Sequence, residues 1–434
     1  MLSFLEHLNQ LLWGFPVLAL LAGAHVYYTV HLKFPQLHTL HAIRLSVTPE
    51  QKKDAGNLSG FAALATTLAA TLGTGNIVGV SSAIAIGGPG ALFWCWITGI
   101  LGMATCYAEC YLSVLFRVRQ KDGSHVGGPM YVLEKGLSCR PLGLFYAACL
   151  LVAAFGVGCT TQSAAITEAV NTIRPVSPHI IGILAAVTAG LVILGGIRSI
   201  GTFCTRMVPA MGFFYIGCCL YLLILNREYF LPACSLILDA AFHPRAAAGG
   251  FIGSTMLGAA RFGVARGLFT NEAGIGTAAV AAAASGTRDP QRQGLISMTA
   301  VFWDTVVMCA VTGLVIISNI LKNPASIQGY SSTGLTSAAF TFLPFGGEAL
   351  LSASLVAFAL TTLIGWCYYG ERASAYLFGE GSLVSYHLCY IVMIYIGAVL
   401  PMDLVWSLTD LINALMVFPG CIALFALRKR VQYR

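Results

Sequence analysis

The chain has 434 residues, of which 57% are hydrophobic and only 9% are Asp, Glu, Lys or Arg. Soluble domains carry about 25% charged residues, so this composition excludes a water-soluble protein of ordinary surface. The formal net charge is +7, and its distribution, described below, matters more than its size. Length and composition together predict an all-α polytopic membrane protein.

The first hydrophobic run extends from Leu11 to Val30. No basic residue precedes it, so it lacks the charged start of a signal peptide and is interpreted as a retained transmembrane helix, residues 11–32. A polar connector, His31 to Gly56, follows and is predicted to contain an amphipathic surface helix.

Ten further membrane spans are expected, in two groups of five. Turn residues separate them, such as Gly87-Gly88-Pro89-Gly90. The first five are predicted over residues 58–86, 90–116, 142–173, 178–197 and 204–226. An outer loop, Asn226 to Ala246, precedes the second five, over residues 246–285, 293–320, 347–377, 383–400 and 403–427.

Two consecutive groups with an odd number of spans must have opposite orientations in the membrane. Inverted repeats of this kind are typical of secondary transporters, whose binding site lies where the repeats meet. The expected division is an N-terminal helix and connector (1–57), a first repeat (58–226), an extracytoplasmic loop (227–245), and a second repeat with a short tail (246–434).

The first member of each repeat is predicted to be a broken helix. Thr71-Leu72-Gly73-Thr74-Gly75-Asn76 lies in the middle of an apolar segment, where each Gly costs about 1 kcal/mol of helix stability. The segment 246–285 is too long for one straight span and contains many glycines together with Arg261, Arg266 and Glu272. Broken helices at mid-membrane are where transporters bind substrate and coupling ion.

The basic residues favour one orientation of the chain. If the N-terminus is outside, most of the 24 Lys and Arg residues fall in loops on the cytoplasmic side, in clusters such as Arg428, Lys429 and Arg430. The protein is therefore expected to be a multi-pass protein of the plasma (bacterial inner) membrane, with a cytoplasmic C-terminus. This bias removes any reason to invoke nucleic acid.

Other chemistry finds little support in the motifs. Gly274-Ile275-Gly276-Thr277-Ala278-Ala279 fits a dinucleotide fingerprint, but no strand precedes it. No phosphate-binding loop and no hydrolase or zinc-protease motif occurs, so an enzyme is not expected. Ionisable residues inside predicted spans, Glu109, Glu168, Asp304 and the Arg261/Arg266 pair, serve either structural pairing or a proton or ion pathway.

The chain resembles the alanine or glycine:cation symporter family over nearly its whole length. The resemblance is carried by motifs that occur in family order: 69–77 (Ala-Ala-Thr-Leu-Gly-Thr-Gly-Asn-Ile), 87–96, 126–131, 263–267, 270–274 and 365–372. Cys95 stands where the family usually has Met. The resemblance implies a leucine-transporter-like fold with one extra N-terminal helix, and about 11 transmembrane helices in all.

The resemblance also implies a substrate site. Free amides at Thr74 and Gly75 would bind the carboxylate of a small neutral amino acid, alanine or glycine, as a helix N-terminus binds anions. Carbonyls around Ala70 and Thr71 would face its ammonium group. Gln162 is similar in position to a substrate contact and could donate to the carboxylate, and Trp366 would close the pocket around a small side chain; core packing is the alternative role for both.

The same resemblance implies a sodium site between the first and eighth core helices. Carbonyls of Ala69, Leu72 and Phe358 and hydroxyls of Thr361 and Thr362 would supply about five oxygens, which suit a hard cation. No cofactor other than Na⁺ as coupling ion is expected. The expected function is Na⁺-coupled uptake by alternating access; an H⁺-coupled transporter, a passive facilitator or channel, a membrane-embedded enzyme and a substrate sensor are the alternatives.

Overall fold

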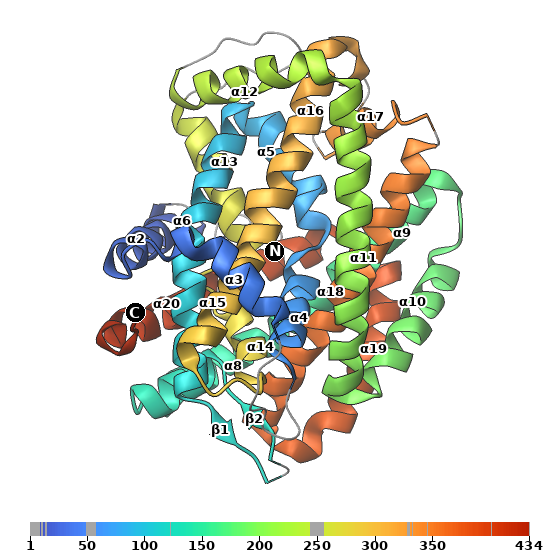
Figure 1. Ribbon diagram of the computed structural model, residues 1–434. Helices are drawn as coiled ribbons and strands as arrows, with labels where there is room; N and C mark the ends of the chain where they lie inside the picture. The colour runs from blue at the N-terminus through green and yellow to red at the C-terminus, as the bar shows by residue number, and fades with distance from the viewer. Residues whose placement is uncertain are drawn as a thin grey trace.

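A computed structural model describes residues 15–48, 58–121, 123–243, 256–327, 333–344, 346–400 and 402–433, together with positions 9, 12, 13, 330 and 331. For residues 402–408 the backbone alone is described. The connector beyond Thr48 and the first residues of segment 246–285 lie outside the described residues. Within the described ranges the protein is helical, apart from one two-stranded hairpin (Figure 1).

The N-terminal part and the first repeat consist of helices that largely match the expected ranges. In chain order they are α2 (Phe15–His31), η1 (Pro35–His38), α3 (Thr39–Val47), α4 (Gly60–Thr71), η2 (Thr74–Asn76), α5 (Val78–Gly87), α6 (Gly90–Leu115), the hairpin β1 (Val118–Arg119) and β2 (His125–Val126), α7 (Pro129–Tyr131), η3 (Val132–Gly136), α8 (Arg140–Phe155), η4 (Gly156–Thr160), α9 (Thr161–Ile173), α10 (Pro178–Ile193) and α11 (Gly196–Leu225).

A helix that was not expected precedes the second repeat. That helix is α12 (Arg227–Phe242), which occupies most of the predicted outer loop. The remaining elements are α13 (Met256–Asn271), α14 (Thr277–Ala283), α15 (Pro290–Val301), η5 (Phe302–Cys309), α16 (Ala310–Lys322), η6 (Pro324–Ile327), α17 (Leu335–Phe340), α18 (Gly347–Phe378), η7 (Glu380–Ser382), α19 (Leu383–Val399), α20 (Met402–Ala426) and η8 (Arg428–Arg430).

By length and composition, 7 described helices can cross a membrane, or up to 9 if each of two bent pairs counts as one span. One bent pair is α2 with the η1–α3 segment, and the other is α4 with η2–α5. α10 adds a shorter apolar helix, and the α13–α14 pair does not enter this count. The prediction of a polytopic helical membrane protein is confirmed, whereas the number 11 stays a prediction.

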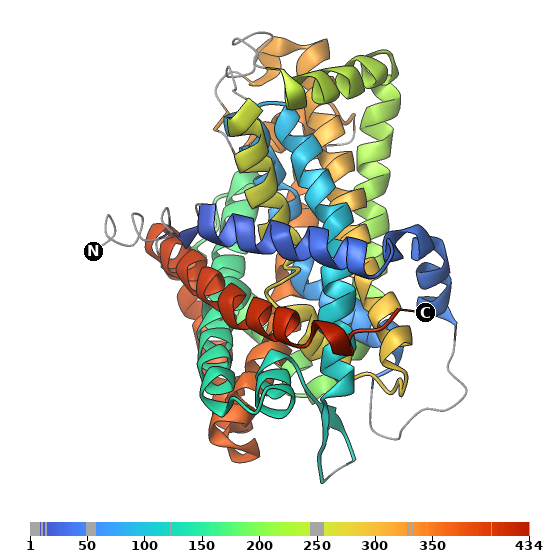
Figure 2. The ribbon, with the colours of Figure 1, turned by 90° about the vertical axis from the view of Figure 1, so that its left-hand side faces the viewer.

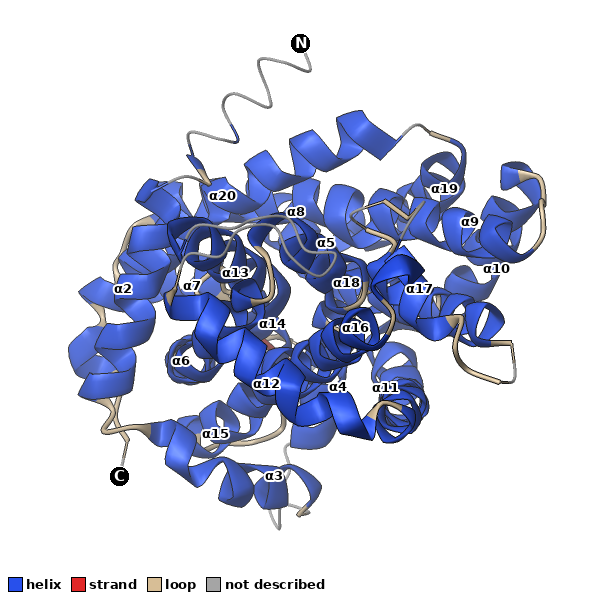
Figure 3. Ribbon diagram, turned by 90° about the horizontal axis from the view of Figure 1, so that it is seen from above, coloured by secondary structure: helices blue, strands red, loops and turns tan. Residues whose placement is uncertain are grey.

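The long helices run in roughly one direction, with α12 at one end of the bundle and the β1–β2 hairpin at the other (Figure 1). Helices α2 and α20 pack against each other and cross the outside of this bundle (Figure 2). In the view along the bundle, α4 lies inside it (Figure 3), where α11, α14, α15 and α18 all contact it. The broken first helix therefore lies in the core.

Both predicted breaks are present. The first lies between α4 and α5, whose axes differ in direction by 61°. The second separates α13 from α14 and includes Glu272 to Gly276. Helices α6 and α18 are unbroken and run beside these pairs, α6 against α13 and α14 and α18 against α4. Two π-helical segments, η4 and η5, interrupt two further long helices. Gly158 in η4 packs against Trp366, and Asp304 in η5 accepts a hydrogen bond from Asn76 in the first break. Segments of this kind are frequent at functional sites.

Candidate functional site

The first break leaves helical geometry between Thr71 and Val78. Ser59 begins α4 as its N-cap, with its hydroxyl accepting from the Ala62 amide at 3.0 Å. Every residue from Ala62 to Thr71 is buried. Gly73 is then extended, with φ −127° and ψ −160°. Main-chain groups of a fully buried segment are thus released from the helix pattern at mid-length, where they need other partners.

Helix α18 supplies such partners on one side. An added Cβ at Gly365 would lie 3.0 Å from the Ala70 amide nitrogen and 3.1 Å from the Ala69 Cβ, so this glycine lets the two helices approach closely. One turn away, the buried Thr362 hydroxyl lies 3.3 Å from the Leu72 carbonyl oxygen and 3.0 Å from the Phe358 carbonyl oxygen. Three of the five oxygen donors expected for Na⁺ therefore meet at one point.

The other two expected sodium ligands are close in sequence but have separate surroundings. The Thr361 hydroxyl donates to the Ala357 carbonyl at 2.6 Å, which is the usual bond of a Thr inside a helix. Ala69 is in contact with Gly365 through its Cβ, as described above. The Thr361 hydroxyl would join the oxygens of Leu72 and Thr362 only after a change of rotamer. The Ala69 carbonyl would join them only after a change of backbone.

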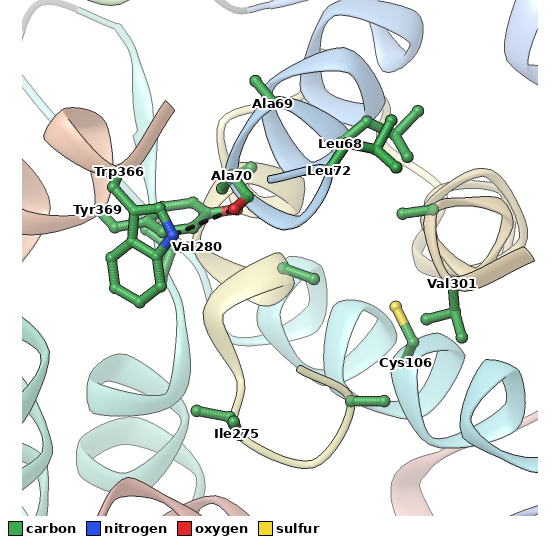
Figure 4. Packing of buried hydrophobic residues seen from close by; sticks show 14 of the residues in the cluster. Leu68, Ala69, Ala70, Leu72, Cys106, Ile275, Val280, Val301, Trp366 and Tyr369 are labelled. Atoms are coloured by element: carbon green, nitrogen blue, oxygen red, sulfur yellow. Dashed lines mark hydrogen bonds between the residues drawn. The ribbon is translucent and has the colours of Figure 1, made fainter. Parts of the chain in front are cut away.

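Trp366 binds the broken helix directly. Its indole Nε1 donates to the Ala70 carbonyl oxygen at 3.2 Å, with the Tyr369 ring beside it (Figure 4). The indole is buried, and an added Cβ at Gly158 in η4 would overlap the Trp366 side chain. The tryptophan predicted to close the pocket thus also holds one of the carbonyls predicted to face the ammonium.

Gln162 follows η4 and faces the break. Its Nε2 donates to the Val157 carbonyl at 3.2 Å, whereas its Oε1 is buried and accepts no hydrogen bond. That oxygen lies 3.7 Å from the position of an added Cβ at Gly73. The free atom is an acceptor, so in this arrangement a contact with an ammonium group fits better than the expected donation to a carboxylate.

Thr71, Thr74 and Gly75 differ in how their polar groups are used. The Thr71 hydroxyl donates to the Thr67 carbonyl at 3.2 Å, and Thr74 is buried at the start of η2. The Gly75 carbonyl accepts from the Arg266 guanidinium at 3.1 Å. A cation therefore lies next to the amides that were expected to bind a carboxylate.

Asn76 and Asp304 form an anchor that sequence reasoning did not assign. The Asn76 Oδ1 accepts from the Gly73 amide at 3.1 Å, and its Nδ2 donates to the Asp304 carboxylate at 2.7 Å. Asp304 belongs to η5 and also accepts from the Thr305 hydroxyl at 2.7 Å. Asp304 thus pairs structurally in this network. The sequence feature that could have indicated this contact is the Asn at the end of the Gly-Thr-Gly-Asn run.

A cavity of about 330 Å³ lies between α5 and α13, in the half of the molecule that carries α12. Arg266, Gly79, Trp13 and Asp410 are among the residues that line it. An added Cβ at Gly79 would coincide with the Arg266 guanidinium, so this glycine makes room for the cation. The cavity reaches the residue that contacts Gly75.

The opposite half is closed by main-chain contacts. The Leu58 amide donates to the Ala284 carbonyl at 3.1 Å, and the Gly286 amide donates to the Leu58 carbonyl at 2.7 Å. Arg117 adds a hydrogen bond of 2.7 Å to the Ser285 carbonyl. The start of α4 and the end of α14 are therefore tied together on the side of the hairpin.

Two broken helices packed between unbroken ones define a secondary transporter of the leucine-transporter-like fold. Solved structures agree on the fold. A Na⁺-coupled sialic acid symporter matches with a TM-score of 0.57 and 13% identity, covering 96% of this chain and 88% of that one. MhsT in complex with L-phenylalanine matches with a TM-score of 0.59 and 14% identity, covering 87% and 90%.

The chain belongs to the sodium:alanine symporter family, which matches residues 1–433. A relative named sodium/alanine symporter AgcS, from Methanococcus maripaludis, is 41% identical over 98% of this chain and 94% of its own. An uncharacterized transporter of Haemophilus influenzae is 44% identical over 98% and 94%, and the probable sodium/glutamine symporter GlnT of Bacillus subtilis is 34% identical over 99% and 90%. The protein is thus a cation-coupled amino-acid symporter and not an enzyme.

Proposed function

We propose that the protein couples inward Na⁺ flow to the uptake of alanine or glycine. It would do so in the plasma (bacterial inner) membrane, with its N-terminus outside and its C-terminus in the cytoplasm. The observation that carries the proposal is the meeting of the Thr362 hydroxyl with the Leu72 and Phe358 carbonyls at the end of α4. This contact joins the broken helix to α18 through oxygen atoms alone.

The chemistry of these oxygens favours Na⁺ over other coupling ions. Hard cations take oxygen donors, and a singly charged ion needs no carboxylate to balance it. The donors that meet are one hydroxyl and two carbonyls, and Ala69 and Thr361 would join them only after a change of backbone or rotamer. A bound Na⁺ would pull the end of α4 toward α18 and hold the break in one shape.

The surroundings of the break suit an amino-acid zwitterion with a small side chain. Arg266 beside Gly75 favours a carboxylate near the amides of Thr74 and Gly75. The free Gln162 oxygen and the carbonyls of Ala70 and Thr71 favour an ammonium group on the other side. Trp366, confined by Gly158, leaves little room for a large side chain.

Alternating access would open the two halves in turn. The cavity between α5 and α13 would give access from one half, while the Leu58–Gly286 contacts would close the other. Moving one charge through 100 mV supplies about 2.3 kcal/mol. At one Na⁺ per substrate this supports roughly fifty-fold accumulation from the membrane potential alone.

The test is uptake into liposomes containing the purified protein. An imposed inward Na⁺ gradient should drive accumulation of radiolabelled alanine, with glycine competing and glutamine, the substrate in a relative's name, competing weakly. If a proton gradient drives accumulation and a Na⁺ gradient does not, the sodium assignment is wrong. If exchange of alanine proceeds without any ion dependence, the protein is a facilitator.

The sodium site itself is tested by Thr362→Ala. Loss of the hydroxyl that joins α4 to α18 should raise the Na⁺ concentration for half-maximal uptake about tenfold, equivalent to about 1.4 kcal/mol. The matched control is Thr188→Ala, because Thr188 makes the same bond to the preceding turn on the exposed side of α10. An unchanged Na⁺ requirement in Thr362→Ala would place the ion elsewhere.

A further inference from the structure

Two adjoining cavities lie along α4, on the face away from Trp366. The first, called the polar pocket below, has a volume of about 170 Å³ and lies where α3, α4 and α15 meet (Figure 3). The second, called the apolar groove, has about 260 Å³ and lies between α3, α4, α11 and η5. Ser46, Val47 and Phe61 line both, so the two cavities adjoin at these residues.

The apolar groove is lined by one face of each of two helices. The residues of α4 recur at helical spacing and are Phe61, Leu64, Ala65, Leu68 and Leu72. Those of α11 are Val208, Pro209, Gly212, Phe213 and Ile216. Small residues make the space between these faces, since an added Cβ at Gly212 would have no atom within 4 Å.

The groove opens at the surface of the bundle and has the length of an acyl chain. Val47 and Phe213 at its edge are 66% and 74% exposed, whereas Leu64 and Val208 in its wall are buried. Phe61 and Leu72 are 11 positions apart, which corresponds to about 16 Å of helix. One leaflet contributes about 15 Å to the hydrocarbon core of a bilayer. A chain that enters beside Phe61 would therefore reach the first break.

The polar pocket carries a positive charge. Arg292 at the start of α15 lines it and donates to the Thr48 carbonyl at 2.9 Å. Among the described residues no Asp or Glu pairs with Arg292, and none lines either cavity. Ser59 and Thr287, which carry hydroxyls, are in the same wall, together with the start of α4. An arginine beside hydroxyls and a helix start favours an anion such as a phosphate.

The occupant must therefore be anionic at one end and apolar along a chain. Residues 49–57, which follow Thr48 in the sequence, are Pro-Glu-Gln-Lys-Lys-Asp-Ala-Gly-Asn and include no large apolar side chain for the groove. A phospholipid with an acidic head group has both parts in this order. The bilayer around the protein supplies such a lipid at the exposed edge of the groove.

We infer that one acidic phospholipid binds here, with its phosphate at Arg292 and one acyl chain in the apolar groove. In the proposed orientation it belongs to the cytoplasmic leaflet. The chain ends at Leu72, whose carbonyl meets the Thr362 hydroxyl. A filled groove leaves α4 no space to move toward α11, so the lipid holds α4 against α18 and favours Na⁺ binding. This effect on transport rests on the proposed function, whereas the binding of the lipid does not.

The first experiment measures binding without transport. The purified full chain in detergent is mixed with equal amounts of phosphatidylglycerol and phosphatidylcholine that have the same acyl chains, and retained lipid is identified by native mass spectrometry. The wild type should retain one phosphatidylglycerol with a preference of about fivefold, the contribution of one basic side chain. Arg292→Gln should lose this preference, and Arg119→Gln, which removes an exposed charge from the hairpin, should keep it.

Gly212→Leu tests the groove independently of Arg292, because the new side chain would occupy the space there. The matched control is Gly217→Leu, since Gly217 is also in α11 and has equal space but does not line the groove. Gly212→Leu should retain about fivefold less phosphatidylglycerol than the wild type, and Gly217→Leu should retain as much.

Three results of these measurements would overturn the inference. One is equal retention of the two lipids by the wild type, and another is wild-type retention in either Arg292→Gln or Gly212→Leu. The third is displacement of the lipid by an equal concentration of glycerol phosphate, which would mean that the pocket holds a soluble phosphate. A dimer that forms in place of lipid binding and is lost in Gly212→Leu would likewise assign the groove to a second copy of the chain.

The second experiment measures the Na⁺ concentration for half-maximal alanine uptake. The vesicles are phosphatidylcholine alone, or equal parts of phosphatidylcholine and phosphatidylglycerol. Acidic vesicles attract cations to their surface for every variant alike, so the change is compared between variants. Phosphatidylglycerol should lower the Na⁺ requirement of the wild type and Gly217→Leu about fivefold more than that of Gly212→Leu.

The two experiments separate the lipid site from the proposed function. If no vesicle shows Na⁺-driven uptake while the lipid preference is intact, the proposed function is refuted and the lipid site stands. If phosphatidylglycerol changes the Na⁺ requirement of the wild type and Gly212→Leu equally, the link between the lipid and transport is refuted.

Discussion

The two broken helices leave helical geometry by different means. In the first break none of the described residues from Leu72 to Ile77 has a positive φ. The released main-chain groups bond to the side chain of Asn76 within the break and to side chains of other helices. In the second, Glu272, Gly274 and Gly276 all have left-handed φ values, 53°, 94° and 96°. The first break is thus held open by side-chain contacts, whereas the second has a backbone conformation that itself leaves the helix.

The two breaks also differ in the charges of the groups beside them. The partners at the first break are a hydroxyl, an amide, an indole and the Arg266 guanidinium, so this break has a cation beside it. The second break places the Glu272 carboxylate inside the fold, and among the described residues no cation pairs with it. On the proposed symport mechanism, the first break exchanges partners with substrate and ion, whereas the second holds a shape set by its own backbone.

The largest expected effect is on stability, and it is measured by comparing two Gly→Ala variants, one from each break. Gly276→Ala places a Cβ in a left-handed conformation and into overlap with Pro129, so we expect a loss of about 3 kcal/mol of stability or failure to fold. Gly73→Ala has an allowed backbone and a contact of 3.2 Å with the Thr362 hydroxyl, and should lose about 1 kcal/mol. Thermal unfolding in detergent measures both; equal losses would remove the distinction between the breaks.

The next effect concerns the anchor of the first break. Asn76→Ala leaves the Gly73 amide unpaired and removes one donor from the buried Asp304 carboxylate, which should cost about 2–4 kcal/mol. Asp304→Asn keeps the shape without the charge and should cost less. Thermal unfolding of the two single variants and the double variant forms a cycle, and purely additive losses would show that the two residues do not act together.

Much of this arrangement was predictable from the sequence. Glycine, threonine and asparagine inside an apolar segment predicted the first break, and the structure has it between Leu72 and Ile77. The over-long, glycine-rich segment 246–285 likewise predicted the second. Local composition is sufficient here because a backbone that leaves a helix needs residues that tolerate it.

The partners of each break were not predictable in the same way. Asn76 and Asp304 are 228 residues apart in the chain, and Trp366 and Ala70 are 296 apart. Such contacts depend on how whole helices pack, and no local pattern reports them. The start of the following helix was also missed: α10 ends at Ile193, close to the expected 197, but α11 begins at Gly196, eight residues before the expected start at 204. The residues of α12 were expected to form a loop.

The smallest expected effect distinguishes two roles of Trp366 at the first break. Trp366→Phe keeps an aromatic ring, removes the hydrogen bond to the Ala70 carbonyl, worth about 1 kcal/mol, and leaves space where the larger indole was. A carbonyl oxygen has two lone pairs, so Ala70 can accept from the indole and from a substrate ammonium together. If the indole orients this carbonyl toward the substrate, the variant should bind alanine about fivefold more weakly. Tighter binding would instead mean that the indole competes with the ammonium and must leave when substrate arrives. Equilibrium binding of alanine at saturating Na⁺ decides between these roles, and either result bears on whether the contacts of the first break are exchanged during transport.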